Sequence, residues 1–279
     1  MSTELSVVPA SAIARFNEEN VELMEAMEAN EEGFSLGDLV TVPTPAGGAT
    51  KWTIEKIDGD EVTEAITGVL VLVQKYGVLW PTEDPVEGAT PVLRTFDLKI
   101  AELACDPEDI PDHMIETLEK FKLSEATETE PATYDWENLP YNQWGSGKNG
   151  SKLCTEQRML FIQRMDDVFP LLVRCQPGSL KNVTKFLKQL PSASLVPWRA
   201  IVELRLVEAK NGAGQKYSQI MPRLVGKLSR EDGELIKSQI TDHLSKGLAK
   251  RAAVEDPRGY PSDAYDDDTA TAGAYTDAE

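Results

Sequence analysis

Hydrophobic and polar residues alternate with a period of two over much of the chain, which is the pattern of half-buried β-strands. The segments with this pattern are Leu39–Val42, Trp52–Ile57, Val62–Val73, Tyr76–Trp80, Met159–Gln163, Phe169–Cys175, Trp198–Glu208 and Tyr217–Pro222. So many short strands predict an α+β protein whose antiparallel sheet is curled or closed into a small barrel.

Turn residues separate these strands and also bend them. The pair Asp58-Gly59 predicts a tight turn, and Gly68 predicts a bend where the sheet curls, because a glycine lets a strand bend sharply. A sharp reversal of the chain is expected near Gly77. The run LysAsnGlyAlaGly at 210–214 predicts a hairpin between the last two strands.

A second pattern places apolar residues three to four positions apart and predicts helices with peripheral positions. These segments are Ile13–Glu32, Asp109–Leu123, Ser179–Leu190 and Arg230–Ala252. Ser179 is a favourable N-cap residue for its helix. The first helix is acidic with a narrow apolar stripe, which fits either weak docking on the rest of the chain or binding of a partner.

The patterns divide the chain into three parts. Residues 1–36 form an acidic N-terminal helix, residues 37–252 a single β-rich body, and residues 253–279 a disordered acidic tail without apolar periodicity. Within the body, residues 104–140 combine prolines with many acidic residues, and we expect a loose linker there.

Charge is distributed unevenly along the chain, which changes the conclusion that composition alone suggests. The 279 residues include 47 acidic and 28 basic side chains, and the net charge of −19 argues against a nucleic-acid partner. However, residues 1–140 carry −22 and residues 252–279 carry −7, whereas residues 141–251 carry +10. The middle segment therefore has the charge that binding to phosphates requires.

The sequence contains no pattern of an enzyme or of a metal centre. Its two histidines, His113 and His243, lie near no nucleophile or HExxH pattern, and three widely spaced cysteines fit neither a disulfide framework nor a zinc site. The glycine-rich run 145–152 lacks Walker A spacing. We expect no catalytic residue, no metal and no cofactor. Without a secretory signal or a long apolar stretch, the chain is expected in the cytoplasm.

Basic residues alternate with aromatic residues in the body, which is how proteins hold single strands: cations follow the phosphates, and rings stack on the bases. The candidate binding residues are Lys75, Tyr76, Trp80, Trp144, Lys148, Lys152, Arg158, Lys181, Lys185, Lys188, Trp198, Arg199, Arg205, Lys216 and Tyr217. Burial in the core is the alternative for each aromatic residue. The glycine-rich loop at Trp144 is expected to be flexible and to offer backbone N–H groups to phosphates.

The acidic tail suggests regulation. Asp266, Asp267 and Asp268 form a polyanion that could compete with DNA for the basic groove, or recruit replication and recombination proteins. The other interpretation is a tail that only improves solubility.

Residues from Pro140 to about Leu248 resemble a phage-encoded family of single-stranded DNA-binding proteins found among replication and recombination genes. The resemblance lies in NQWGSGKNGSKLC, QRMLFIQR, PLLVRCQPGSLKNVTKFLKQL and WRAIVELRLVEAKNGAGQKYSQIMP. It implies an OB-like body with an acidic C-terminal tail, acting in the cytoplasm of a host cell.

Together these features predict a non-enzymatic protein that binds single-stranded DNA in phage replication or recombination. We expect no membrane partner, and a homo-oligomer remains an option. One alternative is an acidic interaction protein or DNA mimic that inhibits a host nuclease or defence factor with its acidic front half. Another is a single-strand annealing protein, which would share the groove but assemble into rings or filaments.

Overall fold

The computed structural model describes residues 6–7, 39–56, 58–82, 90–165, 167, 169–212 and 214–238. The predicted helix Ile13–Glu32, the acidic tail and the end of the last predicted helix lie outside these residues.

The described chain is mostly sheet with few helices, so the predicted α+β class is confirmed. The strands are β1 Ser6–Val7, β2 Thr41–Pro43, β3 Trp52–Ile54, β4 Glu61–Thr63, β5 Ala65–Leu79, β6 Leu93–Thr95, β7 Ile100–Leu103, β8 Lys122–Ser124, β9 Thr133–Asp135, β10 Cys154–Gln163, β11 Leu171–Cys175, β12 Ala200–Lys210 and β13 Lys216–Lys227. The α-helices are α2 Asp112–Phe121, α3 Leu180–Gln189 and α4 Arg230–Ile236. The 3-10 helices are η2 Pro107–Asp109, η3 Pro140–Asn142, η4 Lys148–Gly150, η5 Pro177–Ser179, η6 Pro191–Ala193 and η7 Pro197–Arg199.

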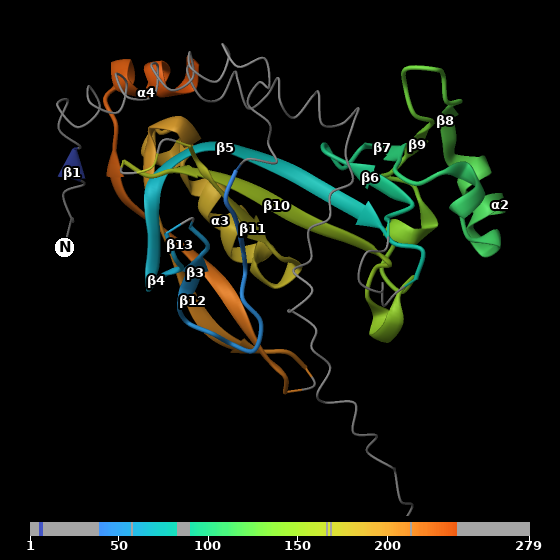
Figure 1. Ribbon diagram of the computed structural model, residues 1–279, viewed down its shortest axis with the longest axis horizontal. Helices are drawn as coiled ribbons and strands as arrows, with labels where there is room; N and C mark the ends of the chain where they lie inside the picture. Colours follow the sequence, from blue (N-terminus) through green and yellow to red (C-terminus); the bar gives the residue numbers. More distant parts are fainter. Residues whose placement is uncertain are drawn as a thin grey trace, which may run out of the picture.

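Strand β5 organises the sheet. Val69 is in register with both Ile201 of β12 and Gln163 of β10, so these two strands lie on opposite edges of β5. Towards its end, β5 keeps β10 on one edge and pairs with β6 on the other. One strand therefore belongs to both halves of the sheet, and Figure 1 shows it curving strongly.

Two glycines of β5 are required by close contacts. A Cβ atom on Gly68 would overlap the carbonyl oxygen of Gln163, at the place where the sequence predicts a bend. A Cβ atom on Gly77 would lie 2.6 Å from Cζ2 of Trp136. The predicted reversal near Gly77 is wrong, because β5 continues through this position and the glycine makes room for an indole ring.

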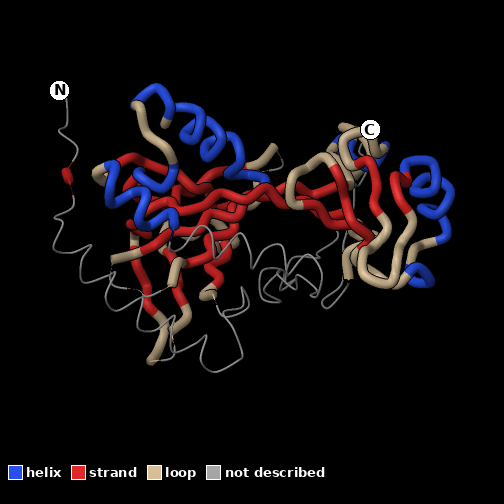
Figure 2. The backbone as a smooth tube through the Cα atoms, turned by 90° about the horizontal axis from the view of Figure 1, so that it is seen from above, coloured by secondary structure: helices blue, strands red, loops and turns tan. Residues whose placement is uncertain are grey.

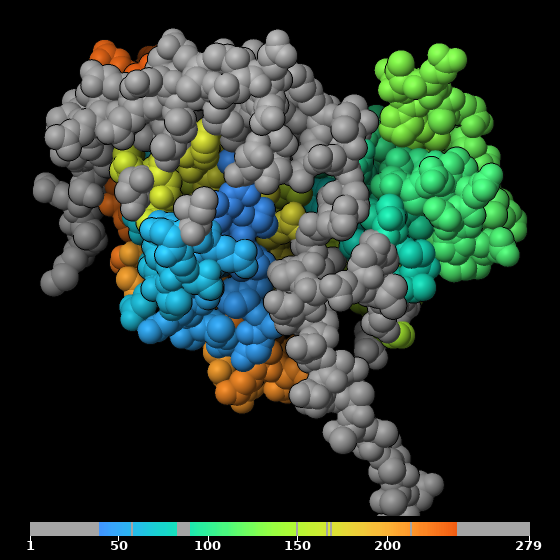
Figure 3. Space-filling model, in the orientation of Figure 1, coloured from blue at the N-terminus to red at the C-terminus, as the bar shows by residue number. Residues whose placement is uncertain are grey.

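The sheet stays open within the described part of the chain, so the barrel alternative is not supported. Its order is β1-β13-β12-β5-β6-β7-β9-β8, while β10, β11 and β2 extend from the other edge of β5. Figure 2 shows two thicker parts joined by a narrow band of strands. We call residues 90–153 the distal lobe, which forms a green mass at one end in Figure 3. The larger part is the main body, and the bridge consists of residues 74–79 and 154–159.

Both faces of the main-body sheet are covered by apolar contacts. On one face, Phe186 of α3 packs in the same cluster as Leu160 of β10. This cluster includes Trp52, whose indole N–H donates a hydrogen bond to the carbonyl of Leu204 at 2.9 Å. On the other face, α4 contributes Ile236 to a second cluster. No helix of the described chain is long and apolar enough to cross a lipid bilayer.

The segment 104–140 is folded, and its prediction as a loose linker is wrong. It forms η2, α2, β8 and β9, and its buried Met114, Trp136 and Leu139 share one core with Leu79 of β5 and Cys154 of β10. Apolar residues are sparse here and separated by prolines and acids, so no strong periodicity marks these short elements. The distal lobe is therefore a firm support for the loop that leads into β10.

A charged cluster connects the β3–β4 hairpin to the end of β10. The ammonium of Lys56 lies 2.7 Å from Glu61, and the guanidinium of Arg164 contacts the same carboxylate at 3.0 Å. Arg164 also pairs with Asp167 at 3.1 Å. The hydrogen bond from Lys56, assisted by Arg164, lowers the pKa of Glu61 below its ordinary value.

The free energy of unfolding is expected to fall as the pH drops below 4.5, the ordinary pKa of Glu61, and to fall less steeply in the Glu61→Gln variant. Because the folded-state pKa is lowered, this stabilisation is present above the unfolded-state pKa and is lost as the pH approaches the folded-state value. Urea unfolding at about pH 7 and about pH 4 measures the difference. An equal decline in both proteins would contradict the assignment.

Candidate nucleic-acid interface

One indole projects from the distal lobe next to the bridge. Trp144 is 80% exposed, whereas the other four tryptophans are buried or half-buried. An indole offers a large flat surface on which a base can stack. Because Trp144 contributes almost nothing to the core, its ring is available to an aromatic ligand.

Hydrogen bonds hold the loop that carries this indole. The N–H groups of Gly145 and Gly147 donate to the carbonyl of Ser151, both at 3.0 Å. The hydroxyl of Ser146 accepts from the N–H of Leu153 at 3.0 Å. The prediction of a flexible loop with unused N–H groups is therefore wrong, because these amides are used within the loop. Its side chains, rather than its backbone, are left to contact a ligand.

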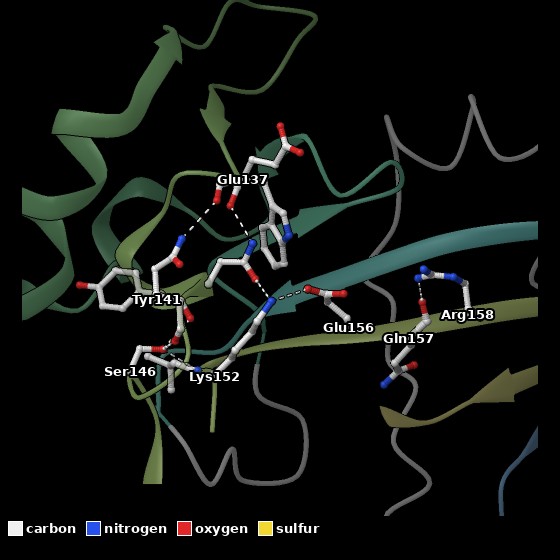
Figure 4. A network of polar contacts seen from close by, with 11 residues as sticks. Glu137, Tyr141, Ser146, Lys152, Glu156, Gln157 and Arg158 are labelled. Atoms are coloured by element: carbon white, nitrogen blue, oxygen red, sulfur yellow. Dashed lines mark hydrogen bonds and ion pairs between the residues drawn. The ribbon is translucent and has the colours of Figure 1, made fainter. Parts of the chain in front are cut away.

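Lys152 is fixed between three groups beside the exposed indole. Its Nζ lies 2.9 Å from Glu156 Oε1, 3.1 Å from Asn142 Oδ1 and 5.8 Å from the centroid of the Trp144 ring. Figure 4 shows Lys152 and Glu156 pointing toward each other above β10. Lys148 is exposed on the same loop. The loop thus combines an aromatic face with two cations.

A pair of like charges lies next on the bridge. Lys75 of β5 is directly opposite Arg158 of β10, and residues opposite each other on antiparallel strands point to the same face. Within the described residues, neither side chain has a carboxylate in salt-bridge distance. The neighbouring Glu156 pairs with Lys152 instead. Two opposed cations are destabilising on their own. An anion bound between them would remove this cost.

Helix α3 extends the basic surface on the same face of the sheet. Arg158 is opposite Cys175, the last residue of β11, and η5 leads from there into α3 while lying against β10. The lysines Lys181, Lys185 and Lys188 are exposed along one stripe of α3, at positions i, i+4 and i+7. Within the described residues, no carboxylate lies in salt-bridge distance of these three lysines. A basic surface therefore runs from the Trp144 loop across the bridge to α3.

Two predicted stacking residues are buried instead. Tyr76 is 5% exposed and Trp80 is 9% exposed, and both belong to the second apolar cluster of the main body. The Tyr76 ring packs against Phe96 with centroids 5.5 Å apart. Neither ring can receive a base without unpacking, so both are removed from the candidate site and the core alternative applies.

Two other predicted residues hold α4 in place. The ammonium of Lys237 lies 4.9 Å from the centroid of the half-buried Trp198 ring. The guanidinium of Arg199 donates two hydrogen bonds to the carbonyl of Leu228, at 3.3 and 3.2 Å. Their roles are structural, and we remove them from the site as well.

The last three predicted residues lie on the β12–β13 hairpin, and none has an open charge or ring. Arg205 pairs with Glu203 at 2.8 Å, and Lys216 pairs with Glu208 at 3.0 Å. The Tyr217 ring packs so closely on the backbone at residue 178 that a side chain there would overlap it. The structure does not bring these residues together with the Trp144 loop.

Three residues of the site carry no signal in the sequence. Glu156 and Asn142 orient Lys152, and Ser146 braces the loop through its hydroxyl. Acid, amide and hydroxyl side chains of this kind are common on any surface. Only their contacts in the folded chain distinguish them.

Two of the three cysteines are buried and are poorly placed to react. Cys154 and Cys175 are buried, and burial raises the pKa of the Cys175 thiol to about 12, so it does not act as a nucleophile. In the described residues, no three side chains of metal-binding type converge. No protein-family model, curated protein or solved structure matches the chain.

Proposed function

We propose that this chain binds single-stranded DNA and catalyses no reaction. The strand would lie on the basic surface from the Trp144 loop across the bridge to α3. The observation that carries the proposal is the 80% exposed indole of Trp144 on a hydrogen-bonded loop, together with Lys75 and Arg158 on the adjoining bridge, two cations without carboxylate partners in the described residues. An open, curled sheet would take the place of the OB-like barrel that the resemblance implies.

Stacking on Trp144 favours a single strand over a duplex. A base must leave its partner before its face can lie on an indole, and unpaired bases pay no such cost. The site has one exposed ring and several separate cations, so it contacts bases without reading their edges. We therefore expect weak sequence preference and strong dependence on salt.

The distal lobe limits where the strand can lie. Residues 90–139 carry 13 acidic and 4 basic side chains, and the acids include Asp112 and Glu116 on α2. Such a surface repels phosphates. The strand would therefore continue from Trp144 toward α3 and leave the outer surface of the distal lobe uncovered.

The biological setting of the proposal rests on the resemblance described above. We place the protein in phage DNA replication or recombination, with tail-dependent partners from the same processes. If the protein also anneals complementary strands, the same basic surface would hold the first strand.

The direct test compares a labelled single-stranded oligonucleotide with the duplex of the same sequence at about 50 and about 200 mM salt. We expect tighter binding of the single strand and a loss of affinity at the higher salt. Absence of binding at low salt would refute the proposal. Equal affinity for both forms would remove the stacking role of Trp144.

Lys75→Ala is expected to weaken binding several-fold and to reduce the salt slope by about 0.7, the value of one single-strand phosphate contact. The matched control is Lys120→Ala, because Lys120 lies on the acidic lobe and pairs with Glu116 at 2.7 Å. Titrations at several salt concentrations measure both slopes. Equal effects of the two substitutions would place the strand elsewhere.

Deletion of residues 257–279 is expected to tighten single-strand binding at low salt. The deleted segment includes Asp266, Asp267 and Asp268, which would otherwise compete with the phosphates for the basic surface. The salt slope should change little, since the phosphate contacts remain. An unchanged affinity at low salt would show that the tail does not compete.

One observation supports the alternative of an acidic interaction protein. A DNA mimic needs carboxylates on rigid elements, and α2 and η2 provide such elements within the acidic distal lobe. The same binding assay separates the two functions, because a mimic would not retain the oligonucleotide. Its partner would be a host nuclease or defence factor.

A further inference from the structure

A carboxylate lies inside the basic surface and neutralises one of its cations. The Oε1 atom of Glu156 is 2.9 Å from the ammonium of Lys152, and the two side chains are 27% and 24% exposed. Glu156 is two residues before Arg158 on β10, so both side chains point to the same face and their Cα atoms are about 7 Å apart. Figure 4 shows Lys152 reaching toward Glu156, with Arg158 farther along β10. A phosphate bound at Arg158 would therefore lie next to this ion pair.

The structure around Lys152 does not depend on its ammonium. Hydrogen bonds to Ser146 and Ser151 hold the loop. Asn142 is fixed separately, because its side-chain amide donates a hydrogen bond to the carbonyl of Trp136 at 3.1 Å. The ammonium of a lysine is carried on a flexible four-carbon chain, so it can change partner while the loop stays in place. A partly exposed ion pair is weak, and a phosphate can compete for the ammonium.

We propose that the pair of Lys152 and Glu156 is an autoinhibitory contact. In the free protein Glu156 neutralises Lys152, and a strand phosphate bound at Arg158 takes the ammonium from the carboxylate. This inference rests on the proposed function, since it concerns the regulation of the same surface. A bound strand has to displace a carboxylate, which makes binding weaker and release faster than the number of cations would give.

The Glu156→Gln variant tests the contact, because it keeps the size of the side chain and removes its charge. One released ammonium adds one phosphate contact, which increases the salt slope by about 0.7. We therefore expect the variant to bind a labelled single strand about 8-fold more tightly than the parent protein at about 50 mM salt, and about 3-fold more tightly at about 200 mM. Titrations at several salt concentrations measure both quantities.

Glu116→Gln is the matched control. Glu116 also pairs with a lysine four positions away, since the ammonium of Lys120 lies 2.7 Å from its Oε1 atom, but this pair is on the acidic distal lobe. The substitution changes the net charge by the same amount. It should leave the affinity and the salt slope unchanged.

A second background separates release of Lys152 from simple repulsion by the carboxylate. In the Lys152→Met variant no ammonium can be released, so adding Glu156→Gln should raise the affinity by less and leave the salt slope unchanged. Circular dichroism confirms that each variant is folded.

The autoinhibitory contact and the proposed function fail in different ways. If the parent protein binds the strand, three results would each overturn the contact alone: no gain from Glu156→Gln, an equal gain from Glu116→Gln, or equal gains with and without Lys152. If neither the parent protein nor Glu156→Gln binds the strand at low salt, the proposed function is refuted and the contact with it.

Discussion

Trp144→Ala is expected to weaken binding of single-stranded DNA by about 5- to 150-fold, because stacking of a base on an aromatic ring contributes about 1–3 kcal/mol. The loop itself should survive, since its hydrogen bonds involve Ser146, Ser151 and the backbone rather than the indole. The loss of affinity therefore measures the contribution of the indole ring. The free energy of unfolding should change by less than about 0.5 kcal/mol, as for other exposed positions.

The matched variant is Trp144→Phe, which keeps a flat ring and should retain most of the affinity. Titration with a fluorescently labelled oligonucleotide measures all three proteins. If alanine and phenylalanine at this position bind as tightly as tryptophan, the exposed indole is not part of the interface. If both lose affinity equally, the ring acts by something other than stacking.

Trp136→Ala is expected to lower the free energy of unfolding by about 3–5 kcal/mol, the range for removal of a large buried aromatic side chain. The Trp136 ring has no exposed surface and fills the space left by Gly77 on β5. The backbone carbonyl of Trp136 also accepts a hydrogen bond from Asn142 at the base of the Trp144 loop. The cavity left by removal of this ring would lie where the distal lobe meets the bridge.

Urea unfolding followed by circular dichroism measures this loss, with Trp144→Ala as the control. Both variants remove the same side chain, one from a fully buried position and one from a position that is 80% exposed. Because the removed side chain is the same, the difference between the two losses of unfolding free energy measures the effect of burial. Similar losses in the two variants would mean that the distal lobe is not packed as described.

The strands and α3 could be predicted because their signals are local. Alternation of β-branched residues marks the segment that became β5, and the apolar spacing of Val183 and Phe186 marks α3. The distal lobe could not be predicted in this way. Its core is assembled from single apolar residues such as Met114 and Leu139, which lie far apart in an acidic, proline-rich segment.

The sequence predicted only part of the candidate site, because here too contacts between remote segments decide the outcome. Composition identified the cations and the aromatic residues, but burial depends on which remote segments cover them. Tyr76 is covered by Phe96, whereas nothing comparable covers Trp144. Lys75 and Arg158 are 83 positions apart in the chain, and only the β5–β10 register places them side by side.

The bridge acts as a spacer between the exposed ring of Trp144 and the lysines of α3, which the proposed function assigns to the bases and to the phosphates. Its two strands are paired without interruption from Leu79 and Cys154 to Leu72 and Phe161, so the distal lobe is joined to the main body by paired strands rather than by a single-chain linker. Inserting two residues into each strand would preserve the alternation of faces and lengthen the spacer by about 7 Å. The length of DNA protected by one copy should increase accordingly, so strand length rather than loop sequence would set the footprint.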